Sequence, residues 1–564
     1  YTGYVVAIVV LQTISTLATL YLPSLNAEII DGGVSRGDID YIWNRGGIML
    51  VVAFVQVITA VIAVWFGART AMGVGRDVRR DIFRRVSRYS AEDMGHFGSA
   101  TLITRNTNDV QQVQMVYLMI LNFMVAMPIM CVGGIIMAMR EDAGLSWLVW
   151  VSVIVLAVLV LALVGRLMPM FTAMQGKIDR INGILREQIT GIRVVRAFTR
   201  EEHETARFDV ANRDITDISV RIGRVFVLMG PIITLILNVS TGAVLWFGGQ
   251  RVDAGLVQVG SLTAFLQYLL QILVAVMMGT FMAMMLPRAI ICARRIDEVL
   301  RREASISEPA EPVEPAMFHG EVELRDVSFT YPGAEQPVLD GVSFTARPGE
   351  VTAIIGATGS GKTTLLNLLP RLHSATTGEV LLDGVDVSRM ARPAIVERVS
   401  MVPQKPYLFS GTVATNLRLG APEATDEQLW EALDIAQAGF VREHDLGLGM
   451  PISQGGTNVS GGQRQRLSIA RTLLARPKVY LFDDSFSALD LITDAKLREA
   501  LLPRMAEATM IVVAQRVASI EHADQILVME AGRIVARGTH AELVESSPTY
   551  REIVESQVTP EVSS

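Results

Sequence analysis

The sequence has little charge and almost no cysteine. Of its 564 residues, 50% are hydrophobic and only 19% are charged, whereas soluble proteins carry about a quarter charged residues. This balance excludes a disordered chain. Two cysteines are too few for a disulfide framework, so nothing indicates an oxidising compartment. The formal net charge of −7 argues against a nucleic-acid partner, which would need a basic surface.

In place of charge, the first 300 residues contain six long apolar runs. None of the runs contains a charged residue or a histidine; they are 4–22, 46–66, 117–139, 145–164, 225–248 and 262–285. About 20 apolar residues suffice for a helix to cross the hydrocarbon core, and inside a bilayer the backbone must satisfy its own hydrogen bonds. We therefore predict six membrane-spanning helices, one for each run.

Arginine and lysine are concentrated in two of the five connections between these runs. Connections 67–116 and 165–224 contain 8 and 11 of them, against 2, 1 and 1 in 23–45, 140–144 and 249–261. Because positively charged loops stay in the cytoplasm, both long connections and both chain ends are predicted to be cytoplasmic. Each long connection could form two helical legs that extend the spans beyond the membrane.

The composition changes at a stretch rich in proline and glutamate. Residues 305–315 contain three of each, which does not fit a helix interior and predicts an extended connector. Beyond it, β-branched runs at 351–355, 479–482, 511–513 and 525–529 alternate with helical stretches. This alternation is typical of an α/β domain with a largely parallel sheet.

A phosphate-binding motif directly follows the strand predicted at 351–355. Its glycines allow successive backbone N–H groups to surround phosphate oxygens. Lys362 can reach the β- and γ-phosphates, and Thr363 can ligate Mg²⁺. The motif fits G-x-x-x-x-G-K-[ST], and its candidate nucleotide-binding residues are Gly356, Thr358, Gly359, Ser360, Gly361, Lys362, Thr363 and Thr364. The predicted cofactors are ATP and Mg²⁺.

A second motif is the apolar run from Val479 that ends in the carboxylate of Asp483. By itself it fits an ordinary core strand, but beside a phosphate loop it predicts that Asp483 holds Mg²⁺ through water. We predict a membrane α-helical domain of six transmembrane helices with long cytoplasmic extensions, followed by an α/β P-loop nucleotide-binding domain. The predicted boundaries are 1–300 for the first domain, 301–317 for a linker and 318–564 for the second.

A third motif, Ser460-Gly461-Gly462-Gln463, completes a resemblance to the half-transporters of bacterial ATP-binding cassette (ABC) exporters. In that family this signature segment caps the γ-phosphate on the other subunit's phosphate loop. The resemblance implies a multi-pass protein of the bacterial inner membrane with a cytoplasmic nucleotide-binding domain. It also implies a second half-transporter as partner, contact with membrane lipids and a hydrophobic drug-like or lipid substrate.

Further positions match the family one at a time. Tyr331 lies where an aromatic ring stacks on adenine, and Gln404 lies where a glutamine contacts Mg²⁺. Asp490 ends Ser487-Ala-Leu-Asp490, which resembles the loop that bridges the two ATP sites. The stretches 98–109 and 197–208 resemble cytoplasmic loops whose short coupling helices dock on nucleotide-binding domains.

Two departures from the family pattern affect hydrolysis. Asp484 stands where the family has the glutamate that acts as general base or orients water, and its carboxylate is one methylene shorter. Gln515 stands where the family has a histidine, and a glutamine cannot carry a proton to the phosphate. Gln454 also stands where a glutamate is usual, so that glutamate's role cannot be carried over.

These departures spare the binding residues, as in the degenerate subunit of heterodimeric exporters. We therefore predict that this chain's own ATP site is slow and that its signature segment completes a competent site on a different partner. Three alternatives stay open. The chain could pair with itself and form two slow sites, it could belong to an exporter-like importer of lipids or siderophores, or it could be an ATP-binding regulatory subunit with little turnover.

Overall fold

The computed structural model describes residues 1–315 and 317–557. Residue 316 of the predicted linker, and residues 558–564 at the end of the predicted nucleotide-binding domain, lie outside the described residues. The chain divides into two compact units, Tyr1–Ser87 with Gly98–Arg302 and Arg88–Phe97 with Glu303–Ser564. The predicted domain boundaries at residues 300 and 317 stay predictions.

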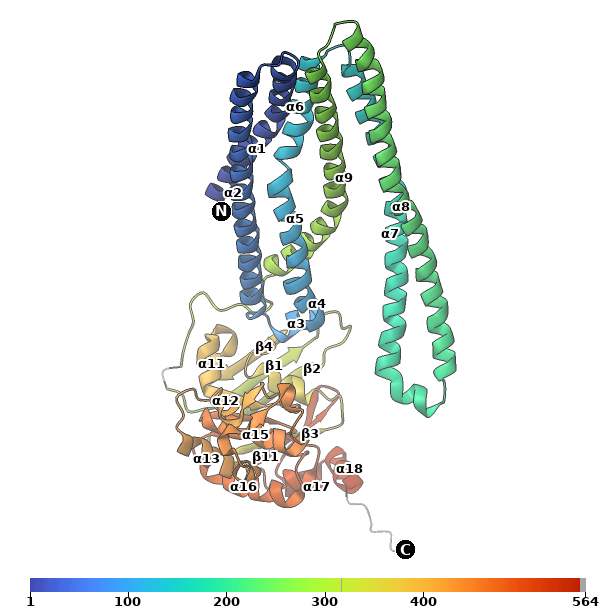
Figure 1. The fold of residues 1–564 in the computed structure, drawn as a ribbon. Helices are drawn as coiled ribbons and strands as arrows, with labels where there is room; N and C mark the ends of the chain where they lie inside the picture. The colour runs from blue at the N-terminus through green and yellow to red at the C-terminus, as the bar shows by residue number, and fades with distance from the viewer. Residues whose placement is uncertain (316, 558–564) are drawn as a thin grey trace. The chain divides into compact units, whose positions relative to one another are not determined.

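The first unit consists of long helices (Figure 1). They are α1 (Thr2–Glu28) with the π-helix η1 (Ile29–Val34), α2 (Ile39–Val86), α4 (Ser99–Thr104) with the π-helix η2 (Arg105–Asp109), α5 (Val110–Phe123), α6 (Ala126–Glu141), α7 (Ser146–Ala197), α8 (Glu201–Asp253) and α9 (Val259–Arg301). Six helical stretches of the described chain are long and apolar enough to cross a membrane. Only 6% to 28% of their most apolar segments is buried, so the prediction of six spans is confirmed.

The third span is divided into two helices, whereas its single apolar run predicted one continuous helix. It divides into α5 and α6, with a turn at Met124 and Val125. Pro128 lies in the first turn of α6. Proline has no N–H to donate, and its ring clashes with the carbonyl four residues earlier, which here belongs to Met124. The break therefore lies where the proline ring meets the preceding turn.

The two longest helices form an antiparallel hairpin (Figure 1). With 52 and 53 residues, α7 and α8 are each about 80 Å long at 1.5 Å per residue. Toward the tip of the hairpin, ion pairs Lys177–Asp214 (3.2 Å) and Arg207–Glu187 (2.8 Å) join the two legs. No separate coupling helix forms between the legs, because only residues 198–200 connect them.

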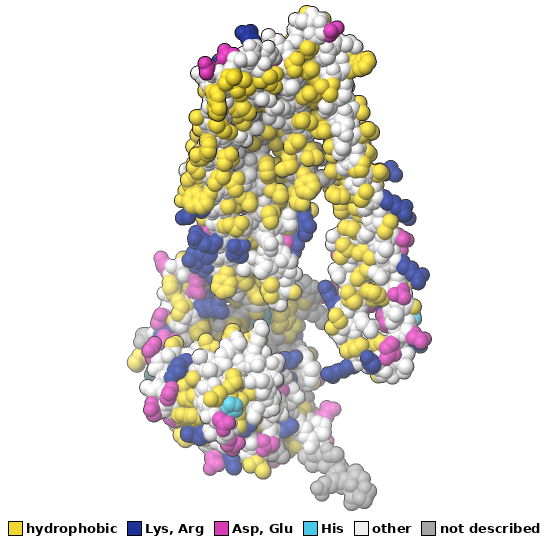
Figure 2. All heavy atoms as spheres, viewed as in Figure 1, with side chains coloured by type: hydrophobic (Ala, Val, Ile, Leu, Met, Phe, Trp, Pro, Cys, Tyr) yellow, Lys and Arg dark blue, Asp and Glu magenta, His cyan; other side chains and the backbone are white. Residues whose placement is uncertain are grey.

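Side chains along these helices change in character with position. Figure 2 shows hydrophobic side chains over the middle of the long helices and charged side chains gathered toward their ends. This distribution is the one expected for helices whose central segments lie in hydrocarbon and whose ends lie in water. The long extensions predicted from the connections 67–116 and 165–224 are therefore confirmed.

The second unit contains two principal sheets. Its strands are β1 (Val322–Phe329), β2 (Leu339–Ala346), β3 (Val351–Gly356), β4 (Thr377–Leu382), β5 (Val385–Asp386), β6 (Val399–Val402), β7 (Gly411–Thr412), β8 (Pro451–Ile452), β9 (Val479–Asp483), β10 (Thr509–Val513), β11 (Gln525–Glu530) and β12 (Arg533–Gly538). The larger sheet has the order β12-β11-β3-β10-β9-β6, parallel except for β12, and an antiparallel sheet has the order β2-β1-β4-β5. The four predicted strands and the mainly parallel sheet are confirmed.

The second unit also contains helices. They are α3 (Ala91–Phe97), α10 (Lys362–Leu368), α11 (Arg392–Arg398), α12 (Val413–Leu417), α13 (Asp426–Ile435), α14 (Phe440–Glu443), α15 (Gly461–Leu474), α16 (Leu491–Met505), α17 (His540–Ser546) and α18 (Pro548–Gln557). Successive strand residues point to opposite faces. In β9, Leu481 packs in one apolar cluster and Phe482 in the other. Because both faces are covered, the strands read as unbroken apolar runs.

The predicted linker lies against the second unit by specific contacts. Ser305 donates its backbone N–H to the buried carboxylate of Asp93 in α3 (2.9 Å). Further along, Glu314 accepts a hydrogen bond from the guanidinium of Arg398 (2.8 Å). The described residues 302–315 form neither helix nor strand and bend at 305–306 and 310–311, and the two contacts fasten them to the second unit. The absence of helix agrees with the prolines, the extended conformation stays a prediction, and the sequence did not indicate these partners.

Candidate nucleotide-binding site

Four neighbouring strands bring the candidate residues to one edge of the large sheet. The strands β3, β10, β9 and β6 lie side by side and run parallel, so their carboxyl ends meet where ligands bind in open α/β sheets. Gly356 ends β3 and Asp483 ends β9, while Gln515 and Gln404 follow β10 and β6 by two residues. Residues about 160 positions apart in sequence thus become neighbours.

The phosphate loop, residues 356–361, leads from β3 directly into α10. Gly361 has a φ of +96°, which L side chains rarely adopt. A Cβ added there would lie 2.8 Å from Leu339 Cδ2 and 2.9 Å from the carbonyl oxygen of Val338. The loop therefore requires glycine at this position for both conformation and space. Thr358 and Gly359, at the tip of the loop, are exposed.

The side chain of Lys362 folds back into the phosphate loop. Its Nζ donates hydrogen bonds to the carbonyl oxygens of Gly356 and Ala357, both at 2.8 Å, and reaches Ser360 Oγ at 3.4 Å. Burial lowers the pKa of the Lys362 ammonium, and the nearby carboxylates oppose that shift. A positive charge held inside a loop of backbone N–H groups suits a phosphate anion.

The oxygen ligands proposed for Mg²⁺ lie together beside the loop. Thr363 Oγ1 donates to Asp483 Oδ1 at 3.0 Å, and Asp483 is only 2% exposed. Burial raises the pKa of Asp483, which the hydrogen bond from Thr363 opposes. Hydroxyl, carboxylate and amide oxygens are ligands that Mg²⁺ accepts. Among the described residues no group of three or more acidic, His or Cys side chains could hold a metal ion.

Asp484 lies between two glutamines. Its Oδ2 accepts from Gln515 Nε2 at 2.8 Å and from Gln404 Nε2 at 3.1 Å, and the residue is 7% exposed. The backbone of Asp484 has a φ of +49°, a conformation that costs a non-glycine residue about 1 kcal/mol or more. Hydrogen bonds Asp484 N to Val513 O (3.0 Å) and Ser487 Oγ to Asp484 O (2.9 Å) fix that conformation.

The predicted adenine-stacking residue lies at the end of β1. Tyr331 is 38% exposed, and its hydroxyl lies 3.2 Å from Thr364 Oγ1. The rings of Phe329 and His373 meet Tyr331 edge-on, at centroid distances of 4.8 and 5.5 Å. Edge-on neighbours fix an aromatic ring while leaving a face available for stacking.

The signature segment forms the start of α15. Ser460 is the N-cap: its Oγ accepts from Gln463 N (3.2 Å), and Gln463 Oε1 accepts from Ser460 N (3.0 Å). This reciprocal pair is a capping box. A Cβ added at Gly462 would lie 3.1 Å from Ala488 O, beside the loop that ends at Asp490. Within the described part of the chain, Ser460–Gln463 form no hydrogen bond with the phosphate loop.

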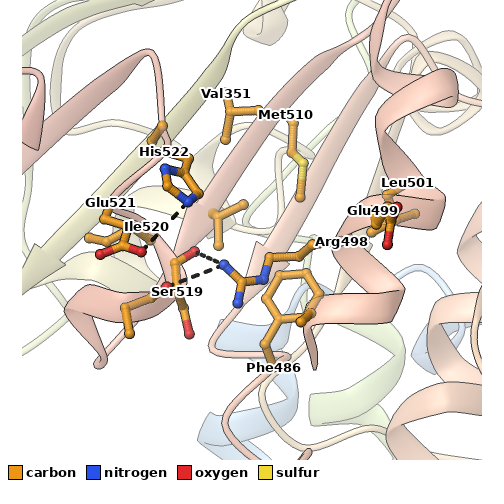
Figure 3. A pocket seen from close by; sticks show the side chains of 14 residues that line it. Val351, Phe486, Arg498, Glu499, Leu501, Met510, Ser519, Ile520, Glu521 and His522 are labelled. Atoms are coloured by element: carbon orange, nitrogen blue, oxygen red, sulfur yellow. Dashed lines mark hydrogen bonds and ion pairs between the residues drawn. The ribbon is translucent and has the colours of Figure 1, made fainter. Parts of the chain in front are cut away.

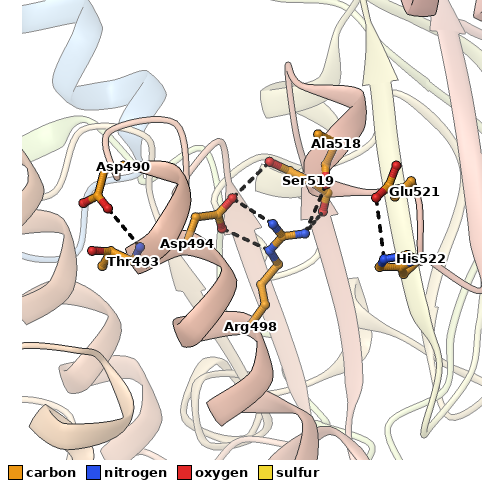
Figure 4. A network of polar contacts seen from close by, with 8 residues as sticks. All are labelled: Asp490, Thr493, Asp494, Arg498, Ala518, Ser519, Glu521 and His522. Carbon is orange, nitrogen blue, oxygen red and sulfur yellow. Dashed lines mark hydrogen bonds and ion pairs between the residues drawn. The ribbon is translucent and has the colours of Figure 1, made fainter.

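A network that the sequence patterns did not reveal joins α16 to the loop that follows Gln515. Asp490 caps α16 by accepting from Thr493 N at 3.0 Å. One turn later, Asp494 accepts two hydrogen bonds from Arg498, whose Nη1 also donates to Ser519 O at 3.1 Å (Figure 4). The spacing of Asp494 and Arg498, four residues apart on a helix, was the signal available in the sequence.

Arg498 also lines a cavity of about 440 Å³ between α16 and the sheet (Figure 3). Apolar side chains form most of its wall, among them Phe486, Met510 and Ile520. The cavity lies beside the segment that follows Asp484 and the segment that follows Gln515. Both segments therefore border open space on this side.

Comparison with known proteins defines the class of this protein. Residues 5–276 match the ABC transporter transmembrane region, and residues 339–487 match the ABC transporter family. The chain belongs to the ABC transporter family, with ATP hydrolysis coupled to transport. It is a multi-pass protein of the inner membrane with a cytoplasmic nucleotide-binding domain, as predicted from the sequence.

Individual relatives cover nearly the whole chain. An uncharacterized ABC transporter ATP-binding protein of Mycobacterium tuberculosis is 48% identical over 99% of this chain and 96% of its own length. A fatty acid ABC transporter ATP-binding/permease protein of Mycobacterium bovis is 32% identical over 89% of this chain and 80% of its own. A solved bacterial Atm1-family ABC exporter with ATP bound has a TM-score of 0.81 at 21% identity, covering 99% and 98% of the two chains, which shows the fold.

Proposed function

We propose that this chain is one half of an ATP-driven exporter that moves a hydrophobic drug-like or lipid molecule out of the inner membrane or cytoplasm. The exporter fold supports this proposal, as does the fatty acid transporter among the relatives. The six apolar runs contain no charged residue, and an uncharged pathway suits an apolar substrate.

Within this proposal the chain's own ATP site binds nucleotide and hydrolyses it slowly. The observation that supports slow hydrolysis is that one carboxylate oxygen of Asp484, Oδ2, accepts hydrogen bonds from both Gln515 and Gln404. A general base must lie within hydrogen-bond reach of the water that it activates. Here the side chain is one methylene shorter than that of glutamate, and its Oδ2 is held by two neutral amides, which cannot take up a proton.

The binding residues keep the chemistry that nucleotide requires. Lys362 and the backbone N–H groups of the phosphate loop hold the phosphates, and Tyr331 stacks on the base. Thr363, Asp483 and Gln404 would hold Mg²⁺, which neutralises phosphate charge when it is bound. The site therefore retains ATP across transport cycles while hydrolysis takes place elsewhere.

The competent site is assigned to a partner with a different sequence. Ser460, Gly461 and Gly462 are exposed or half-buried residues at the start of α15. A hydroxyl and the positive end of a helix suit the γ-phosphate of a nucleotide bound to the partner. Asp490, in the loop after Asp484, would lie between the two sites. A chain with a slow site and an intact signature segment fits a heterodimer.

Recovery of the tagged chain from its native membrane, with mass spectrometry of stoichiometric partners, tests this assignment. We expect a second half-transporter with glutamate and histidine at the positions of Asp484 and Gln515. Recovery of this chain alone, as a dimer of itself, contradicts the heterodimer. A heterodimer whose ATPase activity is not stimulated by substrate would instead support the regulatory alternative.

A further inference from the structure

The loop that carries Gln515 is held by the last described residue of α18. Gln557 Nε2 donates to the carbonyl oxygen of Gln515 at 2.7 Å, and Gln557 Oε1 accepts from the backbone N–H of Val517 at 2.8 Å. One amide group thus bridges the main chain on both sides of Arg516. Both backbone groups would otherwise need water as partner.

The helix that presents Gln557 is itself fixed to the nucleotide-binding unit. Tyr550, in its first turn, is fully buried, and its hydroxyl lies 2.8 Å from His540 Nδ1. On the next turn, Ile553 and Val554 pack against the apolar cluster on the α15 face of the sheet. The position of Gln557 is therefore set by the core of the unit and not by the loop that it contacts.

Among the described residues, the two ends of the loop have further supports, whereas Gln515 is held by the bond from Gln557 and by the hydrogen bond of its side chain to Asp484. Ala514 N donates to Ile354 O at 3.1 Å, as an extension of the sheet. Beyond Val517, the carbonyl of Ser519 accepts from Arg498 (Figure 4). Between these points the side chain of Gln515 is exposed and borders a cavity of about 680 Å³. Packing alone does not fix the loop on this side.

We propose that Gln557 is a positioning residue for the ATP site: its amide sets the place from which Gln515 reaches Asp484. This inference rests on the slow ATP site proposed above. Because Gln557 binds the carbonyl of Gln515 itself, loss of that bond frees the peptide that carries the Gln515 side chain. The contact between Gln515 and Asp484 then weakens. The amide of Gln515 can also donate a hydrogen bond to a γ-phosphate oxygen, so nucleotide is held less firmly when Gln515 is displaced.

The test measures how long this chain retains ATP in the complex purified from native membranes. Radioactive 8-azido-ATP is bound, chased with unlabelled ATP, and photo-crosslinked to this chain at intervals. Gln557→Leu should release nucleotide about fivefold faster, as expected for the loss of one or two neutral hydrogen bonds. Ser556→Ala is the matched control, because its hydroxyl bonds only within α18.

A second variant isolates the bond to Gln515. Gln557→Glu keeps an acceptor for Val517 N but places a carboxylate against the carbonyl of Gln515. It should release nucleotide at least as fast as Gln557→Leu. Retention unchanged by Gln557→Glu contradicts the proposal, and this variant preserves the size of the side chain if Gln557→Leu fails to fold.

A double-mutant cycle separates positioning from general support of the fold. Gln515→Ala should itself speed release, and Gln557→Leu should add nothing in that background. Additive effects would show that Gln557 acts independently of Gln515 and overturn the inference alone. Unchanged retention in Gln515→Ala would instead overturn the proposed role of Gln515 at the site, and with it the inference.

Discussion

One methylene separates Asp484 from the glutamate that the resemblance leads us to expect at this position. A shift of about 1 Å in a catalytic group can lower a rate about 100-fold. The positive φ of Asp484 and its two glutamine partners hold the short side chain in place. At the scale of the residue, the slow hydrolysis that we propose rests on both the length of the side chain and its surroundings.

Restoring both groups should raise hydrolysis at this site. We expect Asp484→Glu with Gln515→His to increase ATP turnover by about tenfold, because a general base and a proton-carrying neighbour contribute at least that much. Phosphate release is measured in a complex that also carries Ser460→Arg, which silences the partner's site under our proposal. Turnover that stays at the level of Ser460→Arg alone would show that other residues keep this site slow, with Gln454 the first to examine.

Motifs predicted the site residues one at a time, but not how they meet. Thr363 and Asp483 were each assigned to Mg²⁺ from sequence, and the structure joins them by a hydrogen bond; their role in binding the ion stays a prediction. The contact of Gln404 and Gln515 with one oxygen of Asp484 was not foreseen. It depends on the order of three strands in the sheet, which local sequence does not encode.

At the scale of the elements, the start of α15 is the part of this chain that we propose completes an ATP site on the partner. Its capping box makes Ser460 important for the helix as well as for the proposed ligand. Loss of such a cap costs about 1 kcal/mol. A test at this position must therefore separate the stability of the helix from recognition of the phosphate.

Ser460→Arg should lower steady ATPase activity of the complex by at least tenfold, because a bulky side chain blocks the surface offered to the partner's nucleotide. Ser460→Asn, which also caps helices well, serves as the comparison for stability. The measurement is ATPase activity alongside the thermal unfolding midpoint of each complex. Full activity in Ser460→Arg would contradict the proposed contact with the partner's nucleotide.

The break between α5 and α6 is a feature that one proline explains. Pro128→Ala should allow the helix to continue through Met124 and Val125, because the added N–H can donate to the carbonyl four residues earlier. Amide hydrogen exchange of residues 124–127 should slow by about tenfold. Pro231→Ala is the control, since α8 already runs unbroken past that proline. Unchanged exchange at 124–127 would assign the break to tertiary packing.

Helices and strands made of unbroken apolar runs could be predicted from the sequence. Strands that mix polar and apolar residues could not. The four apolar strands of the parallel sheet were recognised because both their faces are buried. The antiparallel sheet was missed because its strands mix polar and apolar residues, as in Val322–Phe329 of β1, whose burial alternates irregularly. Hydropathy does not reveal the break at Pro128, because the apolar run 117–139 continues through it.

At the scale of the whole molecule, the first unit is suited to the lipid bilayer and the second to water. The long helices expose apolar side chains along their middles, while the second unit buries its apolar residues on both faces of a sheet. Coupling between the units is what the proposed function requires. A transport measurement decides whether the protein exports or imports its substrate.

Inside-out membrane vesicles that contain the complex should accumulate a fluorescent fatty-acyl lipid or a hydrophobic dye when ATP is added outside. We expect uptake to depend on ATP and to fall with Ser460→Arg, in proportion to the ATPase activity of that variant. Uptake confined to right-side-out vesicles that are loaded with ATP would indicate import. ATPase activity without transport of either probe would direct the search to another substrate class.

The arrangement of the sheet edge has an evolutionary consequence. Asp484 and Gln515 stand at the ends of strands whose interiors form the core, so substitutions at these two positions change the chemistry without disturbing the packing beneath. A duplicated gene could therefore lose hydrolysis in two mutational steps while its product still folded, bound ATP and assembled. Division of labour between paired chains is, for this fold, an easily reached outcome of gene duplication.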